Sequence, residues 1–207
     1  MKIAVLIYGR LNKCVEHYNN IIENIGKDNE IDFFLSSDNS DKSLLNDFIS
    51  LYKPILYNND KIYYNFDFTK YEKRFEVNTD NMICHFMNKD RVFKLFQEYI
   101  IINNIQYDCV ISLRIDCIFR NNFNFNNLLD NTIYIPNGFD FINLGINDQI
   151  AYGKIDAIKK YSSIYSNLLY ILDNKLSIIH PESINYANIH LNKLLIERIN
   201  LQYDIDK

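Results

Sequence analysis

The opening stretch, residues 1–35, constrains the fold most because it alternates between strand-like and helix-like patterns. The run from Ile3 to Ile7 is apolar, residues 13–25 carry apolar side chains on one helical stripe, and the run from Ile31 to Leu35 is apolar again. Two buried strands joined by a helix pair in parallel through a right-handed crossover. This order predicts an α/β protein with a central mixed, mostly parallel sheet flanked by helices.

The composition is that of an ordinary globular protein. Of 207 residues, 48% are hydrophobic and 23% are charged, and the formal net charge is -4 without a basic block. A nucleic-acid polymer is therefore not an expected partner, although Arg10 and Arg114 allow a small anion to bind locally. No apolar run approaches the roughly 20 residues of a membrane-spanning helix, so no transmembrane segment is expected. Without repeats or linkers, residues 1–207 are expected to form a single domain.

The cysteines indicate a reducing environment. Cys14, Cys84, Cys109 and Cys117 are scattered through predicted helices and strands without C-x-x-C spacing. They are typical of reduced core residues in a cytoplasmic protein, and a zinc site is not expected. The short apolar N-terminus runs directly into a turn at Gly9 and Arg10, which favours a first strand over a secretion signal.

The rest of the chain continues the α/β pattern. Asn12 is the predicted N-cap of the first helix, and Gly26 its C-cap. Further helices are predicted over residues 41–51, 79–102, 155–172 and 183–199, and further strands over 55–57, 109–113 and 132–135. Residues 58–77 are polar and aromatic without a clear period, and we interpret them as a substrate-facing lid or acceptor loop.

The strand at 109–113 ends in a change of polarity. Arg114 and Asp116 follow it two positions apart, so both side chains leave the same face of the sheet if the strand continues. Open α/β sheets bind ligands at the carboxyl edge of their central strands. The alternative to a ligand site is an exposed ion pair at a strand end, which contributes little to the stability of the fold.

Polar residues also follow other predicted strands. They are Gly9 and Arg10, the turn from Ser36 to Asp38, and the run Asn147, Asp148 and Gln149. In a doubly wound sheet the strand ends lie along one edge, so residues far apart in sequence converge there. This convergence favours a ligand site over a set of unrelated surface turns.

Four segments together resemble a known family. LRIDCIF, IYIPNG, INDQIAYG and a late HPE, in this order, are similar to the small GT-A-type glycosyltransferases of large algal and amoebal DNA viruses and related bacterial polysaccharide-synthesis proteins. The resemblance covers most of the chain. It implies a GT-A-like, Rossmann-like fold that moves a sugar from a nucleotide-diphosphate sugar to a glycan or other hydroxyl acceptor. A viral source would place the protein in the host cytoplasm.

The resemblance also implies a donor site. GT-A enzymes hold a divalent metal against the diphosphate with a D-x-D motif. In this chain the first position is Arg114, leaving Asp116 as the metal ligand for Mn²⁺ or Mg²⁺. Arg114 can instead supply positive charge directly to a phosphate. Arg10 is expected to contact the nucleotide or a phosphate, and Asp38 the base or ribose, with a turn arginine and a helix-capping aspartate as the structural alternatives.

Asp148 is the expected general base, which the resemblance places in a polar turn before a helix. Its structural alternative is a carboxylate stabilised by the helix dipole. Gln149 is expected to contact the donor sugar or the acceptor. His180, before Pro181 and Glu182, is the expected late metal or phosphate ligand, or otherwise a structural residue. His17, His85 and His190 are interpreted as packing or surface residues.

Two other functions fit the same pattern. A sugar-nucleotide nucleotidyltransferase shares the layered sheet, but it normally has a Gly-rich basic loop where this chain has only Gly9 and Arg10. A non-catalytic nucleotide- or carbohydrate-binding module would explain the missing first aspartate of the D-x-D motif.

Overall fold

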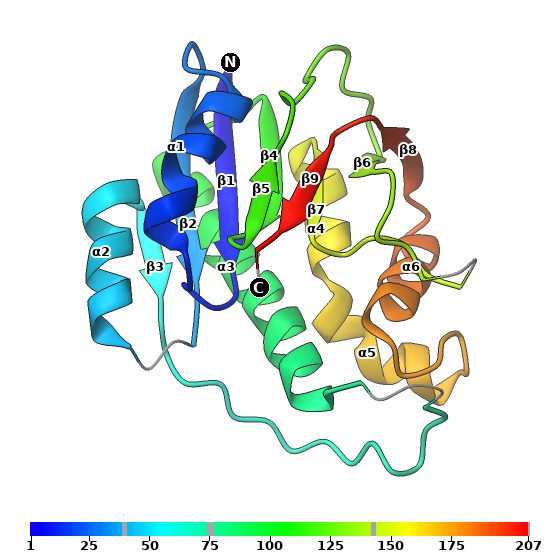
Figure 1. Cartoon of the computed structure of the whole chain (residues 1–207). Helices are drawn as coiled ribbons and strands as arrows, with labels where there is room; N and C mark the ends of the chain where they lie inside the picture. The colour runs from blue at the N-terminus through cyan, green and yellow to red at the C-terminus, as the bar shows by residue number, and fades with distance from the viewer. Residues whose placement is uncertain (39–40, 74–76, 142–143, 207) are drawn as a thin grey trace.

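The protein is an α/β structure built on a seven-stranded mixed sheet (Figure 1). The computed structural model describes residues 1–38, 41–73, 77–141 and 144–206. The strand order is β3-β2-β1-β4-β7-β6-β8. The bounds are β1 Lys2–Tyr8, β2 Glu30–Ser36, β3 Leu56–Asn58, β4 Cys109–Arg114, β6 Thr132–Pro136, β7 Ile150–Gly153 and β8 Leu195–Ile199. β3, β2, β1 and β4 are mutually parallel, whereas β7 is antiparallel to both of its neighbours and β6 is parallel to β8.

Strand β1 is central and is buried on both faces, as its continuous apolar run predicts. Ile3, Val5 and Ile7 face the helices α1 (Cys14–Ile25) and α2 (Lys42–Tyr52). Ala4, Leu6 and Tyr8 share the other core with the helices α3 (Thr79–Asn103), α4 (Ile155–Ser162) and α6 (Pro181–Leu191). The helices therefore cover both faces of the sheet, and the predicted fold class is confirmed at the level of a mostly parallel, Rossmann-like α/β sheet.

The helix ends follow local sequence signals with one exception. Asp41 caps α2 by accepting hydrogen bonds from the backbone N–H groups of Ser43 and Leu44, and Asn78 caps α3 in the same way. Gly26 ends α1 with a φ of 102°, as predicted. The predicted cap Asn12 is wrong, because α1 begins after Lys13, whose backbone is left-handed and whose side chain makes no cap bond.

A small second sheet lies over the α1 side of the main one. β5 (Cys117–Phe119) pairs antiparallel with β9 (Tyr203–Ile205), and neither strand was predicted separately. β4 therefore does not continue through Asp116 as the prediction assumed. It ends at Arg114, and a turn at Ile115 and Asp116 leads into β5.

One predicted helix divides and another ends early. The helix predicted over 155–172 has nearly these outer bounds, but it divides at Ser163 into α4 and α5 (Ile164–Asp173), and residues 150–153 before it form the unpredicted strand β7. The helix predicted over 183–199 ends at Leu191, and residues 195–199 form β8. In both places a short strand gains its hydrogen bonds from a partner distant in sequence, which local periodicity does not report.

The segment between β3 and α3 has no helix or strand in its described part. It runs along the bottom of the view toward α5 before returning to α3 (Figure 1). Tyr64, Phe66, Phe68 and Tyr71 pack against a cluster of apolar residues from α3, α5 and α6. Its aromatic content therefore serves packing, and its role as a lid stays a prediction, part of which falls on residues 74–76, outside the described residues.

None of the helices in the described ranges combines the length and the apolar character needed to cross a bilayer.

Candidate functional site

A large cavity with many polar residues in its wall lies at the carboxyl ends of β1 and β4. From β1 the order of strands runs outward through β2 to β3, and on its other side β4 begins the second half of the sheet. This reversal is the switch point at which open α/β sheets bind ligands. The cavity measures about 960 Å³, and its wall includes residues from the ends of β1 and β4, from α3, from the loop before β7 and from the start of α6.

Arg114 and Asp116 form a bidentate ion pair in the cavity wall. Arg114 Nε donates to Asp116 Oδ1 at 2.9 Å and Arg114 Nη2 to Oδ2 at 2.5 Å, with each side chain 26% exposed. Burial lowers the pKa of the Arg114 guanidinium, but its bonds to Asp116 more than compensate, so the pKa is raised overall. The pair is half-buried and faces the cavity, unlike the solvent-exposed pair of the structural alternative.

Asp148 is buried in the same cavity, with 3% of its surface exposed. Its Oδ2 lies 3.2 Å from His85 Nε2. Burial would raise the pKa of Asp148, but the charges of His85, Lys89 and Arg114 outweigh it and lower the pKa. Asp148 precedes the strand β7 and not a helix, so the predicted polar turn before a helix is wrong and the helix dipole does not stabilise this carboxylate.

The loop that carries Asp148 is fixed by hydrogen bonds from several elements. Tyr8 Oη donates to the carbonyls of Asp148 and Gln149, each at 3.1 Å, and Lys89 Nζ donates to the Asp148 carbonyl at 2.9 Å. From α6, Asn185 Nδ2 donates a hydrogen bond of 3.0 Å to the Asn147 carbonyl. Because the supporting groups are themselves buried, the carboxylate is held in place before any ligand arrives.

Two residues of this site, His85 and Lys89, come from α3 and were missed by the sequence analysis. The His85 ring packs edge-on against Tyr8, in line with the packing interpretation, and it also lines the cavity. Lys89 is fully buried, and its Nζ lies 4.4 Å from the ring centroid of Tyr161. Burial lowers the pKa of Lys89 to about 8. The spacing of four residues, which places both side chains on one face of a helix, was the available signal.

Arg10 and Asp38 also reach the cavity, from the ends of β1 and β2. Arg10 is exposed, and its Nη2 donates to Asn81 Oδ1 on α3 at 2.9 Å. Asp38 Oδ1 accepts a bond of 3.3 Å from Asn88 Nδ2. Both residues are thus oriented by α3 while facing the cavity.

Gln149 does not line the cavity, although its neighbour Asp148 does. Its side chain is buried, and its Oε1 accepts a hydrogen bond of 2.6 Å from Tyr203 Oη on β9. Its carbonyl accepts from the Arg114 backbone N–H at 3.0 Å. The placement gives Gln149 a structural role at the start of β7, and the expected contact with a donor or acceptor has no geometric support.

His180 and Glu182 form the wall contributed by α6. His180 Nδ1 lies 2.9 Å from Glu182 Oε2, and the His180 ring stacks on Phe141 with centroids 3.8 Å apart. Burial, followed by the charge of Asp148, raises the pKa of Glu182 to about 7. Glu182 lies in the first turn of α6, and this turn also faces the cavity.

The backbone of Gly145 packs directly against this first turn of α6. A Cβ at Gly145 would lie 2.6 Å from the Glu182 carbonyl carbon and 2.7 Å from the Ser183 nitrogen. Because these neighbours are backbone atoms, we expect Gly145→Ala to shift the start of α6 and to lower the free energy of unfolding by ~1–3 kcal/mol, as overpacking does. Urea denaturation measures the change, and an unchanged midpoint would contradict the packing described.

The two expected metal ligands, Asp116 and His180, line the same cavity. No group of three or more His, Cys, Asp or Glu side chains within the described ranges is placed to bind a metal ion together. Both carboxylate oxygens of Asp116 accept bonds from Arg114, and His180 is next to Glu182. Binding of Mn²⁺ or Mg²⁺ by Asp116 and His180 therefore stays a prediction.

The fold and the cavity define an α/β protein with a Rossmann-like sheet and a polar site at its switch point. The chain matches no protein-family model and no curated protein.

Proposed function

We propose that the protein is a glycosyltransferase that moves a sugar from a nucleotide-diphosphate sugar to a hydroxyl group of a glycan or other acceptor. One observation carries the proposal. Arg10 and Arg114, at the ends of two neighbouring strands, line the same cavity as the Asp148–His85 couple. Guanidinium groups bind phosphate oxygens in pairs, and a carboxylate–imidazole couple can take a proton from a hydroxyl group. The resemblance to GT-A-type enzymes adds the reaction class.

Within this proposal, Arg114 and Arg10 hold the diphosphate. Arg114 makes two hydrogen bonds to Asp116, and part of its guanidinium group turns to phosphate oxygens when the donor binds.

Among the described residues, the wall of this cavity has more acidic than basic side chains. Five carboxylates face three cations: Asp38, Asp116, Asp148, Glu182 and Asp206 against Arg10, Lys13 and Arg114. A dianionic ligand therefore meets repulsion there, and we expect a divalent cation to strengthen its binding.

His85 is the base that we propose for the acceptor hydroxyl, with Asp148 as its positioning residue. The pKa of Asp148 is low because of its cationic neighbours, so the carboxylate itself is a weak base. Burial lowers the pKa of His85 more than Asp148 raises it, so the pKa lies below its usual value. The imidazole is therefore neutral at pH 7 and can accept a proton. Asp148, 3.2 Å from Nε2, then stabilises the imidazolium.

Calorimetric titration with UDP and GDP, each with and without Mn²⁺, tests the donor site. We expect one diphosphate to bind, more tightly with Mn²⁺, and Arg114→Gln to weaken it ~10- to 100-fold, because two charge-assisted hydrogen bonds are lost. Arg120→Gln is the matched control, since Arg120 pairs with Asp204 on the surface, away from the cavity. Equal affinities of the two variants would contradict a phosphate-binding role for Arg114.

Asp116→Ala in the same titration tests the metal. If Mn²⁺ no longer tightens diphosphate binding in this variant, Asp116 is supported as a metal ligand. If Mn²⁺ tightens binding as much as in the wild type, that role is contradicted.

The ion pair between Arg114 and Asp116 also favours a second candidate function, a nucleotide-binding module that lacks turnover. Such a module would bind the diphosphate but release no UDP or GDP from any sugar conjugate, even in the presence of acceptors.

A further inference from the structure

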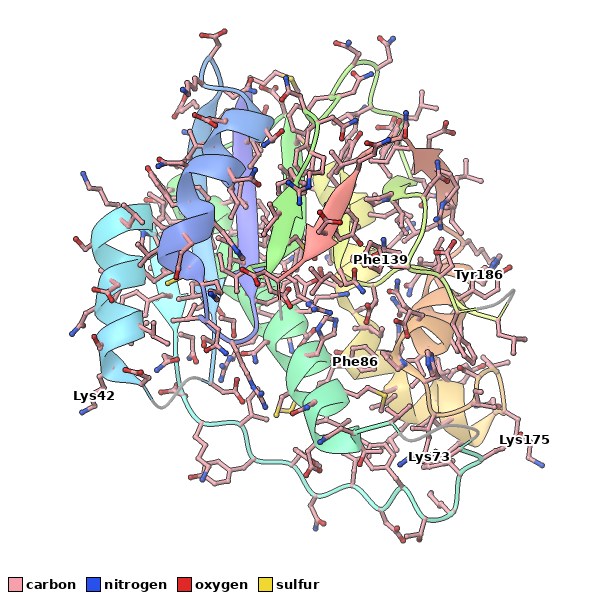
Figure 2. The ribbon with its side chains drawn as sticks, in the orientation of Figure 1. Lys42, Lys73, Phe86, Phe139, Lys175 and Tyr186 are labelled. Atoms are coloured by element: carbon pink, nitrogen blue, oxygen red, sulfur yellow. The ribbon has the colours of Figure 1, made fainter. Side chains whose placement is uncertain are left out.

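A second cavity, of about 680 Å³, lies on the other side of the start of α6. It is formed by residues 70–72, the end of α5, the turn over 175–178 and α6. Figure 2 labels Lys175 and Tyr186, which lie on this side of the molecule. None of its lining residues belongs to the first cavity. The proposed donor site therefore leaves this cavity without a role.

The charged groups around the second cavity balance one another. Lys70 and Lys175 are matched by Glu72 and Asp173 among the described lining residues. Lys70 Nζ lies 3.4 Å from Asp173 Oδ1. A strongly anionic ligand such as a nucleotide finds no excess of positive charge there, whereas a neutral ligand with many hydroxyl groups finds both donors and acceptors.

Two tyrosine rings supply flat apolar surface in this cavity. Tyr71 is oriented by a hydrogen bond of 2.8 Å from its Oη to Asp173 Oδ1, and Lys70 Nζ lies 4.8 Å from its ring centroid. Tyr186 is 42% exposed and packs edge-on against His190. Ordered aromatic faces beside carboxylates and amines suit a pyranose ring, which has apolar C–H faces and a polar rim.

Ser183 provides the independent indication of a ligand. The residue lines the second cavity and is 4% exposed. Within the described part of the chain its Oγ is buried without a hydrogen-bond partner. Buried hydroxyl groups are nearly always satisfied in folded proteins, so the missing partner of Ser183 Oγ beside this cavity favours a ligand that has hydroxyl groups.

The two cavities lie on either side of the first turn of α6, because Pro181 and Glu182 line the first and Ser183 lines the second. We propose that the second cavity binds the acceptor as a neutral oligosaccharide, whose end extends past this turn toward His85. The binding site is assigned from the cavity itself, and its acceptor role rests on the proposed glycosyltransferase function.

The test starts with the full chain on an array of immobilised neutral and acidic oligosaccharides, without nucleotide. A neutral oligosaccharide that binds is then titrated calorimetrically into the wild type and two variants. Tyr186→Ala is expected to weaken binding at least ~10-fold, since it removes one stacking face. Tyr170→Ala is the matched control, because Tyr170 is 55% exposed on α5 and does not line the cavity. It is expected to bind like the wild type.

A second variant guards against a folding artefact. Ser183→Ala is expected to weaken binding of the oligosaccharide. The free energy of unfolding should stay unchanged or rise, because an unsatisfied buried hydroxyl group is removed. The proposal is overturned if no neutral oligosaccharide binds, or if Tyr186→Ala and Tyr170→Ala bind it equally. Oligosaccharide binding without any diphosphate binding would refute the proposed function alone. Diphosphate binding and turnover without oligosaccharide binding would refute the second site alone.

Discussion

Under the proposed transferase function, Asp148→Asn is expected to lower the rate of sugar transfer ~10²- to 10⁴-fold, because the proposed base His85 loses the carboxylate that supports its acid–base role. Asparagine has the size of aspartate, so the hydrogen-bonded loop around it is retained while the negative charge beside His85 disappears. The imidazolium formed during proton transfer then lacks its counter-ion. Single-turnover release of UDP or GDP from the sugar donor measures the effect.

The pH profile separates this role from a structural one. Activity that depends on neutral His85 is lost as the pH falls through the pKa of its imidazole, which burial lowers. Asp148 raises that pKa, so Asp148→Asn should move the acidic limb of the profile to lower pH. Asp204→Asn, in an exposed pair with Arg120, is the matched control and should change neither rate nor profile. An unshifted limb in Asp148→Asn would contradict the coupling to His85.

Phe86→Ala is expected to lower the free energy of unfolding by ~3–5 kcal/mol, the range for truncating a buried phenylalanine. Phe86, labelled on α3 in Figure 2, is fully buried in the cluster that joins α3 to α5 and α6. Urea denaturation followed by circular dichroism gives the value.

Ile102→Ala is the control for this second change. Ile102 lies near the other end of the same helix and is 80% exposed, so its truncation should alter stability by less than ~0.5 kcal/mol. Phe86 also contacts the His85 ring edge-on, with centroids 5.6 Å apart. A loss below ~1 kcal/mol in Phe86→Ala would show that the α3–α5–α6 cluster is not packed as described.

The sequence was informative where structure is encoded locally. β1, α1, β2, α2 and α3 were predicted within a few residues because each has a period or a cap within its own span. β7, β8 and β9 were missed because each is short and depends on a partner that lies far along the chain. β8, for instance, has the sequence LIERI, whose apolar residues also fit the stripe of the helix predicted there, and none of its five residues is buried.

The candidate site divides in the same way. Arg10, Asp38 and Arg114 lie at or just after the ends of parallel strands, and the rule of converging strand ends correctly placed them around one cavity. Asp148 reaches the same cavity for another reason, because it precedes the antiparallel strand β7. His85 and Lys89 were missed because a charged or titratable residue inside a helix is usually on the surface. Only the packing of α3 against the sheet shows that these two side chains point inward. The functional roles of all these residues stay predictions.

Because β5 pairs with β9 near the end of the described residues, the order of synthesis determines when the turn at Asp116 is completed. Asp206 closes the β4–β5 turn, since its backbone N–H donates to the Asp116 carbonyl at 2.9 Å and its Oδ2 lies 3.2 Å from His17 Nε2. A ribosome releases the strands β1 to β4 long before these residues emerge. The parallel half of the sheet, β1 to β4, can therefore form early in translation. The hydrogen bond that closes the turn at Asp116 forms only when residues 203–206 have left the exit tunnel.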